Sequence, residues 1–94
     1  MSMTIFDQIS MRIIKEQELI IGPIAWEEAK KVPGLRVDQK NAEVSFEGDA
    51  KEILNKLVGQ YSRLFGRAST EACKDAVQDL IVELPVDEVP ASLK

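Results

Sequence analysis

The sequence predicts a small α+β domain with the element order α-α-β-β-α-α, in which helices pack on one face of a β-hairpin. Four stretches carry apolar residues at three- and four-residue steps, one stretch alternates apolar and polar residues, and glycine or proline stands at most boundaries. A chain of 94 residues is long enough for one domain. We expect residues 1–84 to form that domain and residues 85–94, which carry two prolines, to be a flexible C-terminal tail.

The first helix is predicted over residues 4–21, where Phe6 and several isoleucines recur at helical spacing. Thr4 is of the residue type that caps a helix N-terminus, and Gly22 ends the pattern. Residues 19–21 are also compatible with an extended strand, so this boundary stays open.

A second helix is predicted within residues 22–32. Pro23 is a favourable first residue of a helix, and Pro33 followed by Gly34 ends it. Trp26 lies at the edge of the apolar side of this helix. A large apolar side chain is usually buried, so we expect Trp26 in the core, with a partner surface as the alternative.

A β-hairpin is predicted next, because the segments 35–38 and 42–47 alternate apolar and polar residues around a short polar turn. The alternation places Ala42, Val44 and Phe46 on one buried face. A two-stranded hairpin is marginal alone and leaves its edges unpaired. We therefore expect it to pack on the helices, and we predict a homodimer or another protein partner that covers an edge.

Two further helices complete the pattern. The third begins after Asp49, its expected N-cap, and ends at Gly66, with an apolar face that includes Leu64 and Phe65. The fourth is predicted over residues 70–84, with Ser69 or Thr70 as its N-cap. The short connection between them predicts an antiparallel helical pair.

The composition disfavours several classes of function. The chain has no histidine, which removes the commonest general base and metal ligand, and a single cysteine, Cys73, expected in the core. The adjacent carboxylates Glu27 and Glu28 are expected on a solvated face. We therefore expect no catalytic residue, no metal and no cofactor.

Charge and hydropathy limit the partners and the compartment. The net charge of −4 disfavours nucleic acid, whose binding depends on clustered positive charge. No segment approaches the roughly 18 apolar residues of a membrane span. The lack of a disulfide framework is typical of a cytoplasmic protein.

The segment LFGRAST, residues 64–70, holds the residues that favour ligand binding most. An anion can bind where backbone N–H groups converge at a helix start beside a cation. The same glycine and hydroxyl residues also serve as ordinary helix caps, which is the interpretation that we favour. The candidate ligand or partner contacts are Trp26, Arg63, Arg67, Ser69 and Thr70.

These observations favour a non-enzymatic protein–protein interaction module, or a regulatory or signalling module. One alternative is a small-molecule or anion sensor with its site at residues 66–70. A second is a winged-helix-like nucleic-acid-binding protein that uses Lys30, Lys31 and Lys40, since helices precede a hairpin.

Overall fold

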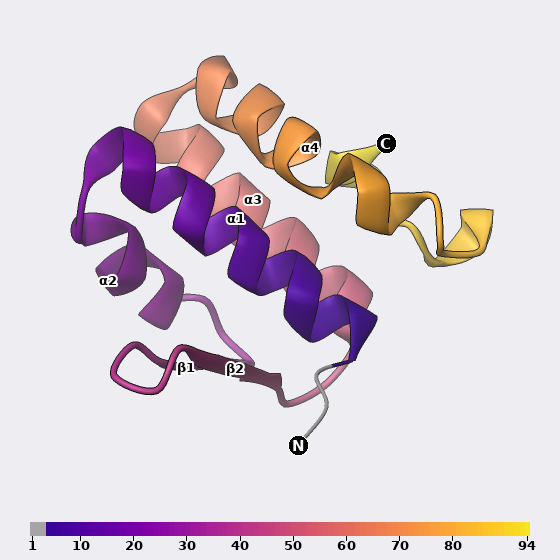
Figure 1. Cartoon of the computed structure of the whole chain (residues 1–94), viewed down its shortest axis with the longest axis horizontal. Helices are drawn as coiled ribbons and strands as arrows, with labels where there is room; N and C mark the ends of the chain where they lie inside the picture. Colours follow the sequence, from indigo (N-terminus) through magenta and orange to yellow (C-terminus); the bar gives the residue numbers. More distant parts are fainter. Residues whose placement is uncertain (1–3) are drawn as a thin grey trace.

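A computed structural model describes residues 4–94 and confirms the predicted α+β order over them; the first three residues of the predicted domain lie outside it. Its elements are the helices α1 (Ile5–Ile21), α2 (Ile24–Lys30), α3 (Ala50–Phe65) and α4 (Arg67–Ile81), the strands β1 (Leu35–Asp38) and β2 (Glu43–Phe46), and the short 3-10 helices η1 (Val86–Glu88) and η2 (Ala91–Leu93) (Figure 1). Within the described residues, no helix combines the length and the hydrophobicity that crossing a bilayer requires.

Helix α1 lies at the centre of the molecule. It packs against α4, α3, α2 and β2, and Figure 1 shows it between α4 on one side and α2 with the hairpin on the other. Ile9, Ile13 and Ile14 are completely buried on its inner face. The opposing side chains of the core include Leu57 of α3 and Val77 of α4. Period-3.6 burial on α1 thus gathers the other helices and the hairpin around one core, with α1 and α2 in contact with the strands.

The caps predicted for two helices are confirmed. The hydroxyl of Thr4 accepts a hydrogen bond from the backbone N–H of Asp7 at 3.1 Å, and the Asp7 carboxylate accepts one from the N–H of Thr4. The Asp49 carboxylate accepts from the N–H of Lys51 at 3.0 Å. Residues 19–21, for which the sequence allows helix or strand, are helical, because α1 continues to Ile21 before Gly22 ends it.

The hairpin packs its apolar face on the helices as predicted, through buried Leu35 and Val44. Its turn is one residue longer than expected, because Ala42 lies in the turn with φ 52° and is exposed. The Asp38 carboxylate accepts from the backbone N–H of Asn41 at 3.2 Å and from its side chain at 2.7 Å, which closes this longer turn.

The start of α4 differs from the prediction. The helix begins at Arg67 and ends at Ile81, whereas the sequence pattern predicts residues 70–84 with a hydroxyl cap. Gly66, with φ 85°, ends α3 and immediately precedes α4. Only glycine adopts this backbone conformation readily, so the corner needs no further loop residues and no hydroxyl cap.

The C-terminal segment lies against the domain, although the prediction separates residues 85–94 from it. Helix η2 packs against α3 and α4, and Leu93 is 5% exposed and belongs to the core. The backbone N–H and hydroxyl of Ser92 both donate to Oδ1 of Asn55, at 3.1 and 2.7 Å. These anchors are too far apart in the sequence for a local pattern to show them.

We predict that Gly34→Ala destabilises the fold by about 2–4 kcal/mol. Gly34 has φ 85°, and an added Cβ would lie 2.8 Å from Cδ1 of Ile53 and 2.9 Å from the carbonyl oxygen of Glu47. Gly59→Ala is the control, because Gly59 has an ordinary helical backbone and no atom within 4 Å of the added Cβ. It should stabilise the protein by about 0.5–1 kcal/mol. Urea unfolding measures both, and equal effects would contradict this account.

Candidate functional site

Trp26 lies in the core. Its side chain is 4% exposed, and its indole Nε1 donates to Oε2 of Glu18 at 2.7 Å. Glu18 belongs to the last turn of α1, so this bond joins α1 to α2 next to their corner. Of the two alternatives that the sequence allows, the structure favours the core.

Ser69 and Thr70 contact neighbouring helices. Ser69 is 3% exposed, and its carbonyl oxygen accepts from Nε2 of Gln17 at 3.1 Å. Thr70 is half-buried, and its hydroxyl hydrogen-bonds the hydroxyl of Ser62 on α3. These contacts give both residues a role in helix packing, in place of the predicted role as N-caps.

Arg63 and Arg67 are the two sequence candidates that lie on the surface. Nη2 of Arg63 donates to Oε1 of Gln60 at 2.8 Å. Within residues 4–94, Arg67 makes no ion pair or hydrogen bond through its side chain. Both arginines lie at the corner between α3 and α4, where a partner can reach them.

Five large apolar side chains are exposed at the two helical corners, and we call them the apolar end surface. They are Leu19 (82% exposed), Ile20 (55%), Ile24 (45%), Leu64 (46%) and Phe65 (37%). The first three belong to the corner between α1 and α2, and the other two end α3. Figure 1 shows both corners at the same end of the molecule.

Buried hydrogen bonds hold these corners together. The Tyr61 hydroxyl donates to the carbonyl oxygen of Ala25 at 2.6 Å, which links α3 to α2. The bond from Gln17 to Ser69 links the end of α1 to the start of α4. Burial raises the pKa of the Tyr61 hydroxyl above its ordinary range, so this donor stays protonated at neutral pH.

The sequence pattern does not predict the apolar end surface. Ile20, Leu64 and Phe65 fit the helical spacing of residues that face a core, and that spacing predicts buried positions for them. It does not show which apolar residues of the last helical turn face outward. The sequence feature that could have indicated this surface is the run of apolar residues at positions 19–21, directly before a glycine and a proline.

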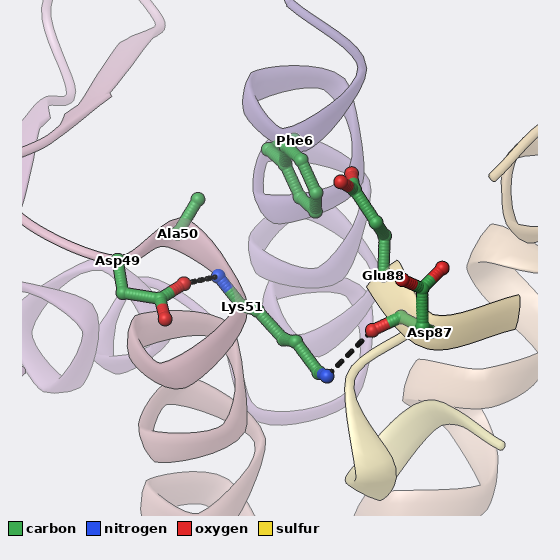
Figure 2. A pocket seen from close by; sticks show the side chains of 6 residues that line it. All are labelled: Phe6, Asp49, Ala50, Lys51, Asp87 and Glu88. Carbon is green, nitrogen blue, oxygen red and sulfur yellow. Dashed lines mark hydrogen bonds between the residues drawn. The ribbon is translucent and has the colours of Figure 1, made fainter. Parts of the chain in front are cut away.

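A surface pocket of about 340 Å³ lies where η1 meets the start of α3 (Figure 2). Its lining residues are Phe6, Asp49, Ala50, Lys51, Asp87 and Glu88. Nζ of Lys51 donates to the backbone carbonyl of Asp87 at 2.6 Å and so spans the pocket. Among the residues that the structure describes, no three or more carboxylates or cysteines gather as a metal site. The hydrogen bond from Lys51 therefore joins α3 to η1 across this pocket.

The lysines of the nucleic-acid alternative face carboxylates. Lys30 lies 3.6 Å from Oε1 of Glu27, and Lys31 donates to Oε2 of Glu28 at 3.0 Å. Lys30, Asp38 and Lys40 line an open groove beside β1. Hydrogen bonds from Asn41, helped by the charge of Lys30, lower the pKa of the Asp38 carboxyl. The groove thus carries both signs of charge.

Glu28 is buried, although a solvated position was expected for it. Its residue is 5% exposed, and Nε2 of Gln60 donates to its Oε1 at 2.7 Å. Hydrogen bonds from Lys31 and Gln60 hold its pKa below the ordinary value. The carboxylate therefore stays ionised and joins α2 to α3.

Cys73 is completely buried, as expected, and contacts Gln17 of α1. Nε2 of Gln17 donates to its sulfur at 3.3 Å, while Oε1 of Gln17 has no hydrogen-bond partner among the described residues. Burial raises the pKa of the Cys73 thiol to about 11, and the hydrogen bond from Gln17 opposes the rise. The thiol is therefore protonated and shielded at neutral pH.

We predict that Gln17→Met changes the free energy of unfolding by less than about 1 kcal/mol. The unpartnered Oε1 costs about 1–3 kcal/mol, and the two bonds made by Nε2 together contribute about the same amount. Gln17→Ala is the control and should cost about 2–4 kcal/mol, since it leaves a cavity. Guanidinium unfolding measures both. A loss above about 1.5 kcal/mol for Gln17→Met would show that Oε1 is satisfied in solution.

We predict that the protein loses stability in alkaline solution through Cys73. The folded pKa of about 11 lies above the ordinary value of 9.0, so this stabilisation is complete below pH 9 and is lost as the pH rises through 11. The loss should be on the order of 2 kcal/mol, and Cys73→Ala should remove it. Urea unfolding in reductant, from pH 8 to pH 11, measures how the free energy of unfolding changes with pH in the wild type and in Cys73→Ala. Parallel slopes would contradict the prediction.

Comparisons of the chain with protein-family models, with curated proteins and with solved structures find no match. The geometry of the described residues is therefore the basis of the functional conclusion.

Proposed function

We propose that this protein is a non-enzymatic protein–protein interaction module of a cytoplasmic regulatory or signalling system, and that it binds through the apolar end surface. The observation that carries the proposal is the exposure of five large apolar side chains at one end of a small domain. Large exposed apolar side chains that gather at one end of a domain are a feature of interaction sites, whereas single exposed apolar residues are ordinary.

The energetics support a binding role for this surface. Fully burying one leucine, isoleucine or phenylalanine side chain is worth about 1.5–3 kcal/mol. Leu19 is 82% exposed and Ile20 is 55% exposed, so most of that free energy is still to be gained when a partner covers them. Arg67 is exposed and follows Phe65 and Gly66 at the same corner, and arginine is enriched among binding hot spots.

The surface is also formed in advance of binding. Tyr61 and Gln17 tie the two corners together by buried hydrogen bonds, and the bond from Trp26 to Glu18 fixes α2 against α1. A partner therefore meets side chains mounted on ordered backbone, which lowers the entropic cost of association.

Site-specific photo-crosslinking in cells that express the protein tests this proposal. A benzophenone amino acid at Leu19 or Phe65 should give defined protein adducts, because these side chains lie in the proposed interface. The same probe at Val82 is the matched control, since Val82 is 81% exposed but lies after the end of α4, away from both corners. Equal adducts at Leu19 and Val82, or none at Leu19 and Phe65, would overturn the proposal.

A further inference from the structure

We propose that residues 82–94 form a strap that opens while the rest of the domain stays folded, and that the site it leaves on α3 and α4 then binds the same segment of a second copy of this chain. The strap follows α4 and contains η1 and η2. Figure 1 shows it leaving α4 at the end of the molecule opposite the two helical corners and returning beside α4. Its binding site is therefore separate from the apolar end surface.

The strap is anchored through its second half. Leu93 is 5% exposed, Pro90 is completely buried, and η2 packs against both α3 and α4. Residues 82–88 are exposed apart from half-buried Leu84. The pocket of about 340 Å³ lies between η1 and the start of α3 (Figure 2). Segments with few buried apolar contacts open at lower free energy than the core does, so the strap can open by itself.

Two side chains of α3 bind main-chain atoms of the strap. Oδ1 of Asn55 accepts from the backbone N–H and the hydroxyl of Ser92, and Nζ of Lys51 donates to the backbone carbonyl of Asp87. Lys51 and Asn55 stand four residues apart, so they lie on one face of α3. All of these contacts are non-covalent, so the identical segment of a second copy can make each of them.

The conformation of the strap is encoded locally. Its turns are closed by backbone hydrogen bonds between positions three apart, from Glu88 to Pro85 and from Leu93 to Pro90. Both prolines have φ −57°, within the range that the pyrrolidine ring enforces. A detached strap therefore keeps part of its bound conformation, which lowers the entropic cost of binding again.

The exposed half of the strap is long enough to reach a second molecule. The extended segment 82–88 spans at most about 23–25 Å, and the shortest dimension of this molecule is 21 Å. A strap that moves outward can therefore lie on α3 and α4 of a neighbouring copy. Exchange of an identical segment between copies is a low-cost route to a dimer, because the contacts are kept.

Native-state hydrogen exchange tests the opening. The amides of Ser92 and Leu93 should exchange through an opening that low urea barely accelerates, whereas the amide of Ile13 should exchange through global unfolding. Tyr61→Phe removes the bond from α3 to Ala25 of α2, and α2 lies away from the strap. It should speed the exchange of Ile13 about tenfold and leave the strap amides unchanged. If urea and Tyr61→Phe act equally on both, the strap opens only with the whole domain and the inference fails.

A labelled peptide of residues 85–94 tests the binding site. An attached segment has an effective concentration of about 1 mM, and a minor open state is populated at about 0.1–10%, so the free peptide should have a Kd of about 1–100 µM. Leu93→Asn in the full chain should release the strap and bind the peptide with this Kd. Val86→Asn is the matched control, since Val86 is 81% exposed in the same strap. Its closed strap should compete and raise the apparent Kd to about 1 mM.

A mixture of two full chains tests the second copy. Leu93→Asn has an intact site and a weakened strap, whereas Asn55→Ala has an intact strap and a weakened site. Sedimentation of the mixture at about 0.3 mM should show more of a species with twice the monomer mass than either variant shows alone.

Two further results would overturn the inference. One is a Leu93→Asn chain that keeps its helices by circular dichroism and yet fails to bind the peptide up to about 1 mM. The other is a mixture in which no more dimer forms than in the separate variants. If Leu93→Asn does not fold, Ser92→Pro replaces it, because it removes both donors that Asn55 binds. The proposed function stands apart from these results, since crosslinking at Leu19 and Phe65 reports on the opposite end of the molecule.

Discussion

Burial of the inner face of α1 is the interaction on which the rest of the structure depends. Ile9, Ile13 and Ile14 lose all of their exposure, and α1 packs against three helices and a strand. Three such side chains contribute on the order of 5–9 kcal/mol, comparable with the whole net stability of a small domain. The hairpin needs this helix most, because two strands with one apolar face are marginal without a cover.

A second group of contacts is polar and lies near the end of the molecule that holds the two helical corners. The side chains of Gln17, Glu28 and Tyr61 are buried, and each makes a hydrogen bond to a different helix. Such bonds add little net stability but fix relative positions, because an unpaired buried polar group is costly. They hold the helices in register at the end where large apolar side chains lie exposed.

Local chemistry predicted much of the fold. The caps at Thr4 and Asp49 depend on residues within one turn, and the alternation around Val44 is visible in a short window. The differences between the structure and the sequence pattern come from distant contacts. The start of α4 depends on Gly66 and on bonds from Ser69 and Thr70 to other helices. The docking of residues 85–94 depends on Asn55 and Leu93. The apolar end surface depends on which side chains of the last helical turns have no element to pack against.

The corner at Gly66 fixes the number of residues between α3 and α4. One glycine separates the two helices, so no loop can absorb a change in length. Each residue added to a helix rotates all later positions of that helix by about 100°. One insertion just after this corner would therefore rotate Cys73 and Val77 out of the core and bring charged positions inward. In contrast, the exposed turn at residues 39–42 can lengthen without moving any buried side chain. Natural variation in length should therefore concentrate in the hairpin turn and spare the helical corner.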